Sequence, residues 1–123
     1  MPAVTTRKVL VVEDDESFRL TLERLLARAG YDVVTVTNPQ VALRIAATEP
    51  LDLVVSDFDL PVMNGGALAE ALQAQLGTLA PPVVVLTGGD PRRADSPAVA
   101  GVAEKPASAG ELLALFEAAL AGR

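Results

Sequence analysis

Acidic, hydroxyl and basic side chains stand at the ends of short apolar runs in this 123-residue sequence. Glu13-Asp14-Asp15 follows the apolar run that ends at Val12, and Asp57 follows a later run. Thr87 ends another run, and Lys105 lies just beyond a further one. Carboxylates that lie together repel each other, and a hard divalent cation such as Mg2+ can supply the missing positive charge. These residue types therefore predict a metal-dependent site suited to a phosphoryl group.

The remaining polar groups fit the same chemistry. Lys105 offers an ammonium group and Thr87 a hydroxyl group, and both can donate hydrogen bonds to phosphoryl oxygens. A phosphoryl group on Asp57 would meet these donors and the metal together, which is the charge neutralisation that phosphoryl transfer requires. The chain has no cysteine and no histidine, which excludes thiolate and imidazole chemistry.

The elements that must position these groups alternate between short β-branched runs and longer segments rich in alanine and leucine. The periodicity predicts strands at 8–12, 31–37, within 51–57, 82–87 and 99–104. It predicts helices over 16–29, from Asn38-Pro39 to about 49, over 66–76, and after the capping-box sequence that starts at Ser108. Gly30 is placed for a left-handed helix cap, and Asp15 or Glu16 for the cap that begins the first helix.

Strands that are apolar along their whole length are typical of parallel sheets covered by helices on both faces. We therefore predict an α/β fold with a doubly wound, five-stranded parallel sheet. Such folds bind ligands at the carboxyl ends of their strands, where the candidate residues stand. The length suits a single domain over 1–123, with a core at about 8–120.

Composition excludes several functional classes. The net charge of −6 argues against a nucleic-acid interface, which needs clustered lysine and arginine. No apolar run approaches the ~20 residues of a membrane span. The first eight residues lack the apolar stretch of a signal peptide. We expect a cytoplasmic protein without a membrane partner.

Four motifs at the predicted strand ends resemble the receiver domain of bacterial two-component response regulators. They are Val11-Val12-Glu13-Asp14-Asp15, the stretch from Ser56 to Gly65, Leu86-Thr87-Gly88 and Glu104-Lys105-Pro106. They occur in the order of that family and extend over almost the full chain from Lys8. The resemblance implies a CheY-like, flavodoxin-like (βα)5 fold with strand order 2-1-3-4-5.

By this resemblance, Asp57 accepts a phosphoryl group from a phosphohistidine on a sensor histidine kinase or a histidine phosphotransfer protein. Thr87 and Lys105 bind the phosphoryl oxygens, and Lys105-Pro106 is a cis peptide. The cofactor is Mg2+, with Mn2+ as a substitute. Its implied ligands are Glu13, Asp14, Asp57 and the backbone carbonyl of Asp59.

The resemblance also implies a signalling role in place of classical enzymatic turnover. The domain would catalyse only its own phosphorylation and dephosphorylation, and would change conformation to signal to a downstream protein. We expect a monomer or a weak dimer.

Two features depart from the family pattern. An aromatic residue is common three positions before the lysine, and here that position is Val102, whose β-branched side chain is stiff. Only 18 positions separate Thr87 from Lys105, and the segment 88–97 contains two glycines and two prolines. This composition predicts a loop or one short turn in place of a regular fourth helix. Our hypothesis is that the signal leaves through this segment or through another surface.

Two other functions are compatible with parts of the sequence. Asp57 and Asp59 resemble the Asp-x-Asp motif of haloacid-dehalogenase-type phosphatases. That family has a further acidic pair after the lysine, on a later strand. Here the acidic residues after the lysine are Glu111 and Glu117, both on the predicted last helix. A pseudo-receiver, which binds partners without being phosphorylated, would fit Val102 and the short segment. The complete set of candidate site residues favours a phosphoacceptor over both.

Overall fold

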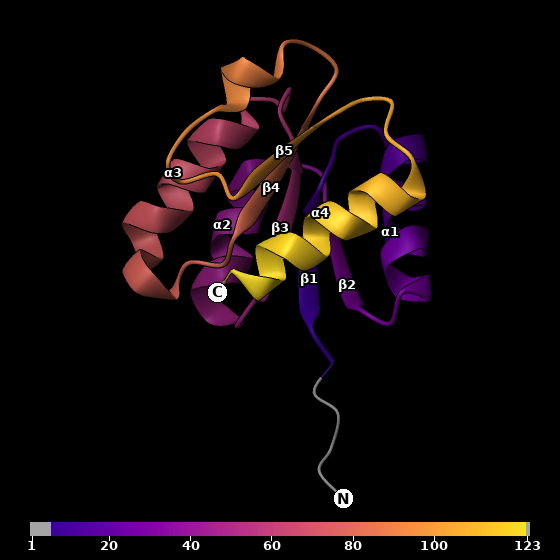
Figure 1. The fold of residues 1–123 in the computed structure, drawn as a ribbon. Helices are drawn as coiled ribbons and strands as arrows, with labels where there is room; N and C mark the ends of the chain where they lie inside the picture. Colours follow the sequence, from indigo (N-terminus) through magenta and orange to yellow (C-terminus); the bar gives the residue numbers. More distant parts are fainter. Residues whose placement is uncertain (1–5, 123) are drawn as a thin grey trace, which may run out of the picture.

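A five-stranded parallel sheet forms the centre of the molecule, with strand order β2-β1-β3-β4-β5 (Figure 1). The computed structural model describes residues 6–122. The strands are β1 (Lys8–Val12), β2 (Asp32–Val36), β3 (Leu53–Asp57), β4 (Val83–Thr87) and β5 (Gly101–Glu104). The predicted fold class, including the strand order, is confirmed.

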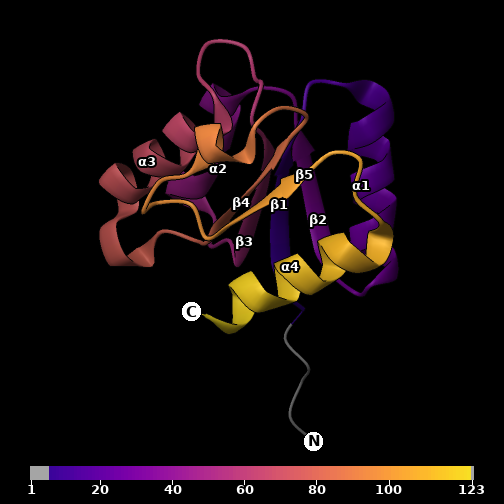
Figure 2. The ribbon, with the colours of Figure 1, turned by 45° about the horizontal axis from the view of Figure 1, so that its top comes forward.

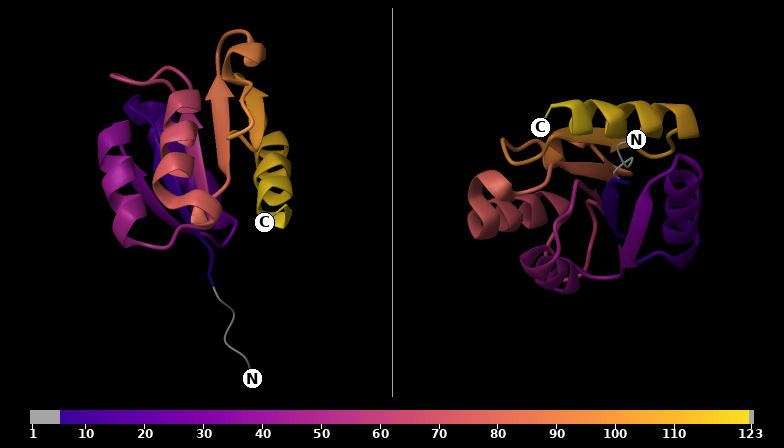
Figure 3. Two further views of the ribbon diagram at one scale, coloured as in Figure 1. Left: turned by 90° about the vertical axis from the view of Figure 1, so that its left-hand side faces the viewer. Right: turned by 90° about the horizontal axis from the view of Figure 1, so that it is seen from below.

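Helices cover both faces of the sheet (Figure 3). One face packs against α1 (Glu16–Arg28) and α4 (Ala109–Ala121), and the other against α2 (Pro39–Thr48) and α3 (Gly65–Leu76). Alternate residues of each strand enter the two cores; in β1, Val9 and Val11 join one cluster while Leu10 and Val12 join the other. Burial on both faces explains the continuously apolar strands.

Local capping fixes where the helices begin and end. At four N-termini, a side chain accepts the backbone N–H three residues further on; these residues are Asp15, Asn38, Asn64 and Ser108. Helix α1 ends at Arg28, and Gly30 follows it with a left-handed φ of +97°; the Gly30 and Tyr31 N–H groups donate to carbonyls of the last turn. The caps expected at Asp15, Gly30, Asn38 and Ser108 are confirmed.

The strand predictions were slightly too long at their ends. Tyr31 lies outside β2 because its N–H completes the cap of α1. Val99 lies outside β5 because its N–H closes a turn onto the Ser96 carbonyl. Helix α3 begins at Gly65, one residue earlier than predicted, because Asn64 supplies its cap.

The segment between β4 and β5 has no regular helix among its described residues. It forms one 3-10 turn, η2 (Pro91–Ala94), which begins at the Asp90 cap and is followed by an irregular stretch (Figure 2). Ala94 is buried and anchors the turn on the hydrophobic core. The prediction of a loop or short turn between β4 and β5, in place of a regular helix, is confirmed. A second short turn, η1 (Gly77–Leu79), follows α3.

Within residues 6–122, we find no helix with the length and apolar composition to cross a bilayer.

Candidate functional site

The predicted site residues meet at one edge of the sheet because all five strands run in the same direction. Glu13 comes directly after β1, and Asp57 is the last residue of β3. Thr87 ends β4, and Lys105 comes directly after β5. This edge lies at the end of the molecule opposite the described N-terminal residues (Figure 1).

Asp57 and Lys105 form the central ion pair of the site. The Lys105 Nζ lies 2.9 Å from Asp57 Oδ1, and the Asp57 residue is only 8% exposed. The ammonium also lies 4.3 Å from the centre of the Phe18 ring, which adds a cation–π contact from α1. The Lys105 backbone N–H donates to the Thr87 carbonyl at 2.7 Å. The expected cis peptide between Lys105 and Pro106 is present.

Three carboxylates surround the position where a metal would bind. Glu13, Asp14 and Asp57 each offer an oxygen, and these oxygens lie within 4.8 Å of one another. Glu13 is 1% exposed, and its Oε2 has no hydrogen-bond partner among the described residues. The Lys105 ammonium is 4.0 Å from that oxygen and faces more than one carboxylate. An unsatisfied buried oxygen in an all-carboxylate set fits a hard divalent cation.

Burial, and to a smaller extent the negative charge of Asp57, raise the pKa of Glu13 to about 7. The Lys105 ammonium lowers this pKa but does not offset the loss of solvent. The Glu13 carboxyl is therefore partly protonated near neutral pH, and a cation that binds there would displace the proton.

The Thr87 hydroxyl is fully buried and oriented by the next residues of its own loop. Its Oγ1 accepts the Gly89 N–H at 3.1 Å, which leaves the hydroxyl proton free to be donated elsewhere. The Asp59 side chain, by contrast, is mostly exposed and binds Arg93 at 3.0 Å. A metal-binding role for the Asp59 backbone carbonyl stays a prediction.

The loop between β3 and α3 is built to hold Asp57 tightly. A β-carbon on Gly65 would lie 2.6 Å from the Asp57 carbonyl oxygen, so only glycine lets α3 begin this close to β3. Val62 has a left-handed φ of +76° and lies in a turn closed by the Met63 N–H on the Pro61 carbonyl at 2.9 Å. A β-branched residue rarely adopts this conformation, which is strained.

Val102 occupies the position where the family commonly has an aromatic residue. It is half-buried and packs against the core cluster that contains Ala94 of the η2 turn. The Val102 side chain and the buried Ala94 of the η2 turn therefore belong to the same hydrophobic core.

Sequence reasoning missed three side chains at this edge. Phe18 was not assigned to the site from the sequence, yet its ring lies against Lys105. Phe58 and Arg93 contact each other, with the guanidinium carbon 4.6 Å from the ring centre. No local signal identifies these contacts because the partners lie far apart in the chain. Asp59 and Arg93, for example, are 34 positions apart.

The fold and this carboxyl-edge site define the class of the protein: a flavodoxin-like α/β domain whose acidic groups and lysine converge at the sheet edge. The family of response regulator receiver domains matches the chain over residues 9–117. The chain belongs to this family, which is a family of signalling domains.

The relatives include proteins of very different length. The alkaline phosphatase synthesis transcriptional regulatory protein PhoP of Bacillus subtilis is 40% identical over 84 residues, a match that covers 68% of this chain and 34% of PhoP. The sensory/regulatory protein RpfC of Xanthomonas campestris is 36% identical over 86 residues, covering 68% of this chain and 12% of RpfC. The chain thus spans about a third or less of these relatives.

Among solved structures, the chemotaxis response regulator CheY4 of Vibrio cholerae is similar over nearly the whole chain. The TM-score is 0.82 at 29% identity, and the match covers 94% of this chain and 99% of CheY4. The recognition of the family from four short motifs is confirmed. Membership of this family does not favour the phosphatase alternative.

Proposed function

We propose that this receiver domain accepts a phosphoryl group on Asp57 in a Mg2+-dependent reaction. The observation that carries the proposal is the buried Asp57 carboxylate, which is paired with Lys105 and adjoins the unsatisfied Glu13 oxygen. This set offers both the nucleophile and the positive charge that a phosphoryl group needs.

The proposed donor is a phosphohistidine on a sensor histidine kinase or a histidine phosphotransfer protein, as implied for response regulators. An Asp57 carboxylate oxygen attacks phosphorus while the bond between phosphorus and the imidazole nitrogen breaks. The bonding pair leaves on that nitrogen, which regains a proton, and the product is an acyl phosphate on Asp57. The domain would promote only this transfer and the later loss of the phosphoryl group to water.

Each neighbouring residue has a proposed task. Lys105 is placed to neutralise a phosphoryl oxygen, and the free proton of the Thr87 hydroxyl to donate to another. Glu13 and Asp14, with Asp57 and the backbone carbonyl of Asp59, would bind Mg2+. When bound, Mg2+ supplies positive charge to the phosphoryl oxygens and carboxylates.

A small phosphodonor such as phosphoramidate tests the proposal without the cognate kinase. With Mg2+, the wild-type chain should gain the mass of one phosphoryl group, and Asp57→Asn should gain none. Excess chelator should abolish the gain in the wild type. If the wild type binds Mg2+ but is never modified, the pseudo-receiver alternative is correct.

A further inference from the structure

The η2 turn brings a second cation to the phosphoacceptor edge. Arg93 lies on this turn, and its guanidinium contacts two neighbours of Asp57: it binds Asp59 at 3.0 Å and lies over the Phe58 ring. The loop between β3 and α3 and the η2 turn stand side by side at this end of the molecule (Figure 2).

The guanidinium borders the space next to the Thr87 hydroxyl. A β-carbon built on Gly89 would lie 3.4 Å from a guanidinium nitrogen of Arg93 and 3.8 Å from Thr87 Oγ1. A side chain at Gly89 would therefore contact both the Arg93 guanidinium and the Thr87 hydroxyl, and glycine avoids this crowding.

The present contacts of Arg93 are weak enough to be exchanged. The side chains of Arg93 and Asp59 are 51% and 67% exposed, and an ion pair with this exposure contributes little to stability. A phosphoryl group is a better partner than one carboxylate, because it carries more negative charge and three strong acceptor oxygens, two of which can accept the planar guanidinium.

We propose that Arg93 is a phosphoryl-binding residue. Once Asp57 is modified, the Arg93 guanidinium breaks its ion pair with Asp59 and binds the phosphoryl oxygens instead. This inference rests on the proposed function of Asp57. Because Arg93 belongs to the η2 turn, its movement draws Pro91–Ala94 toward the site and changes the surface of that segment. This gives the shortened segment a physical connection to the phosphoacceptor that does not depend on an aromatic residue at Val102.

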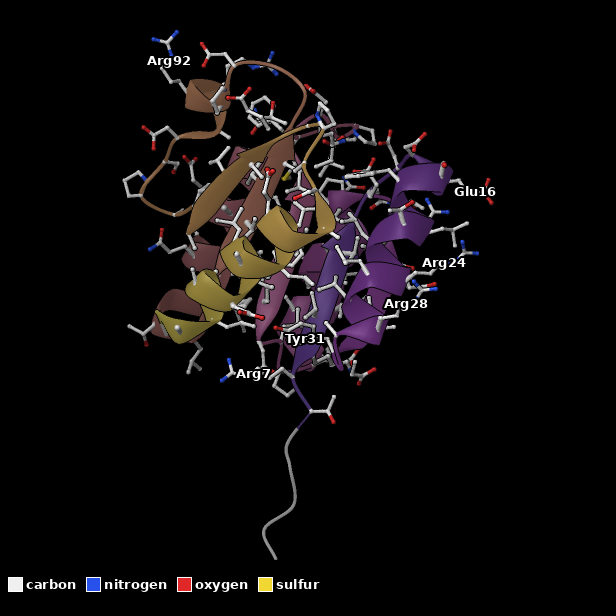
Figure 4. The ribbon with its side chains drawn as sticks, turned by 45° about the vertical axis from the view of Figure 1, so that its right-hand side comes forward. Arg7, Glu16, Arg24, Arg28, Tyr31 and Arg92 are labelled. Carbon is white, nitrogen blue, oxygen red and sulfur yellow. The ribbon has the colours of Figure 1, made fainter. Side chains whose placement is uncertain are left out.

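Arg92 provides a matched control on the same turn. Its guanidinium binds Asp90 at 2.8 Å within the turn, and the side chain is 87% exposed. Figure 4 shows Arg92 directed away from the body of the molecule. Replacement of Arg92 removes one positive charge from the residue next to Arg93 and leaves the contacts of Arg93 with Phe58 and Asp59 in place.

The test compares Mg2+ alone with Mg2+ plus beryllofluoride, a phosphoryl mimic, in the wild type, Arg93→Gln, Arg93→Lys and Arg92→Gln. Fluorine NMR reports the bound mimic, and calorimetry reports Mg2+ binding. Arg93→Gln should weaken mimic binding by about tenfold or more, the effect of losing a charge-assisted contact. Its affinity for Mg2+ alone should not fall, because Asp59 loses its counter-charge and stays available.

Arg93→Lys should be intermediate, since it keeps the charge but loses the planar fork. Arg92→Gln should bind the mimic as the wild type does. Amide resonances of Arg92–Ala94 should shift upon mimic binding in the wild type but not in Arg93→Gln.

Three results would overturn the inference: wild-type mimic affinity in Arg93→Gln, an equal loss of Mg2+ and mimic affinity in that variant, or the same loss in Arg92→Gln. A wild-type chain that binds Mg2+ but not the mimic would instead overturn the proposed function, and the role of Arg93 with it.

Discussion

Glu13 is a buried carboxyl group whose environment disfavours its charged form. Its carboxyl group is removed from solvent, adjoins Asp57, and has one oxygen without a hydrogen bond among the described residues. A raised pKa is the consequence, and it links the site to the stability of the fold.

The metal-free protein should lose stability as the pH rises. The folded pKa of Glu13, about 7, exceeds its ordinary value of 4.5. The native state therefore binds more protons than the unfolded state between these values, and the stability from this group is lost as the pH rises through about 7. Urea unfolding in the presence of chelator measures the effect. Glu13→Gln, which stays neutral, should flatten the fall; parallel profiles for both proteins would contradict the explanation.

Mg2+ affinity should rise with pH for the same reason. A cation at this site displaces the Glu13 proton, so the apparent affinity should increase by up to about tenfold per pH unit below about pH 7. Calorimetry at about pH 6 and about pH 8 measures the change, and two buffers of different ionisation enthalpy count the released proton. Affinity that does not change with pH, with no proton released, would show that Glu13 is not coupled to the metal.

Among elements, the junction of β3 with α3 determines where Asp57 stands. The helix begins with Gly65, whose backbone N–H donates to the Phe58 carbonyl at 2.9 Å, and a β-carbon on Gly65 would lie only 2.6 Å from the Asp57 carbonyl oxygen. No side chain fits between the two elements.

Gly65→Ala should destabilise the fold by about 1–3 kcal/mol, because its β-carbon would collide with the Asp57 carbonyl. The same substitution at Gly110 in α4 meets nothing within 4 Å and should be neutral or stabilising. Chemical denaturation of both variants measures the difference. Equal effects would mean that the close approach of α3 to β3 is not required.

The exposed turn at Val62 should be a second, strained point in this loop. Val62 is 79% exposed and has φ of +76°. Val62→Gly should raise the free energy of unfolding by up to about 1 kcal/mol. Glycine relieves the strain of the positive φ, and the conformational entropy that glycine loses on folding offsets part of this gain. Val62→Ala keeps a β-carbon and should change stability less. The thermal midpoints of both variants test this, and a lower midpoint for Val62→Gly would show that the turn is not strained.

At the scale of the whole molecule, sequence patterns predicted the sheet, its flanking helices and the convergence of Glu13, Asp57, Thr87 and Lys105. They succeeded because buried parallel strands and helix caps leave local signals, and because parallel strands carry their ends to one edge. The absence of a regular helix between β4 and β5 was also predictable, since glycine and proline disfavour a helix through their own local conformations. The contacts of Phe18 with Lys105 and of Arg93 with Phe58 were not, because they depend on how distant elements pack.

Occupation of the site should stabilise the entire domain. A ligand that binds only the folded state at about 100 times its dissociation constant adds about 2.7 kcal/mol, which corresponds to a thermal midpoint higher by roughly 10 °C. Mg2+ with beryllofluoride should produce this shift in the wild type and not in Asp57→Asn. An equal shift in both proteins would place the ligand elsewhere.

The central claim is that Asp57 itself carries the phosphoryl group, and chemical trapping tests it most directly. The chain is treated with phosphoramidate and Mg2+, and then with borohydride, which reduces an acyl phosphate to an alcohol. Peptide mass spectrometry identifies the reduced residue. We predict homoserine at position 57 and unchanged aspartate at positions 14 and 59. Reduction at either of those residues, or at none, would contradict the assignment of Asp57.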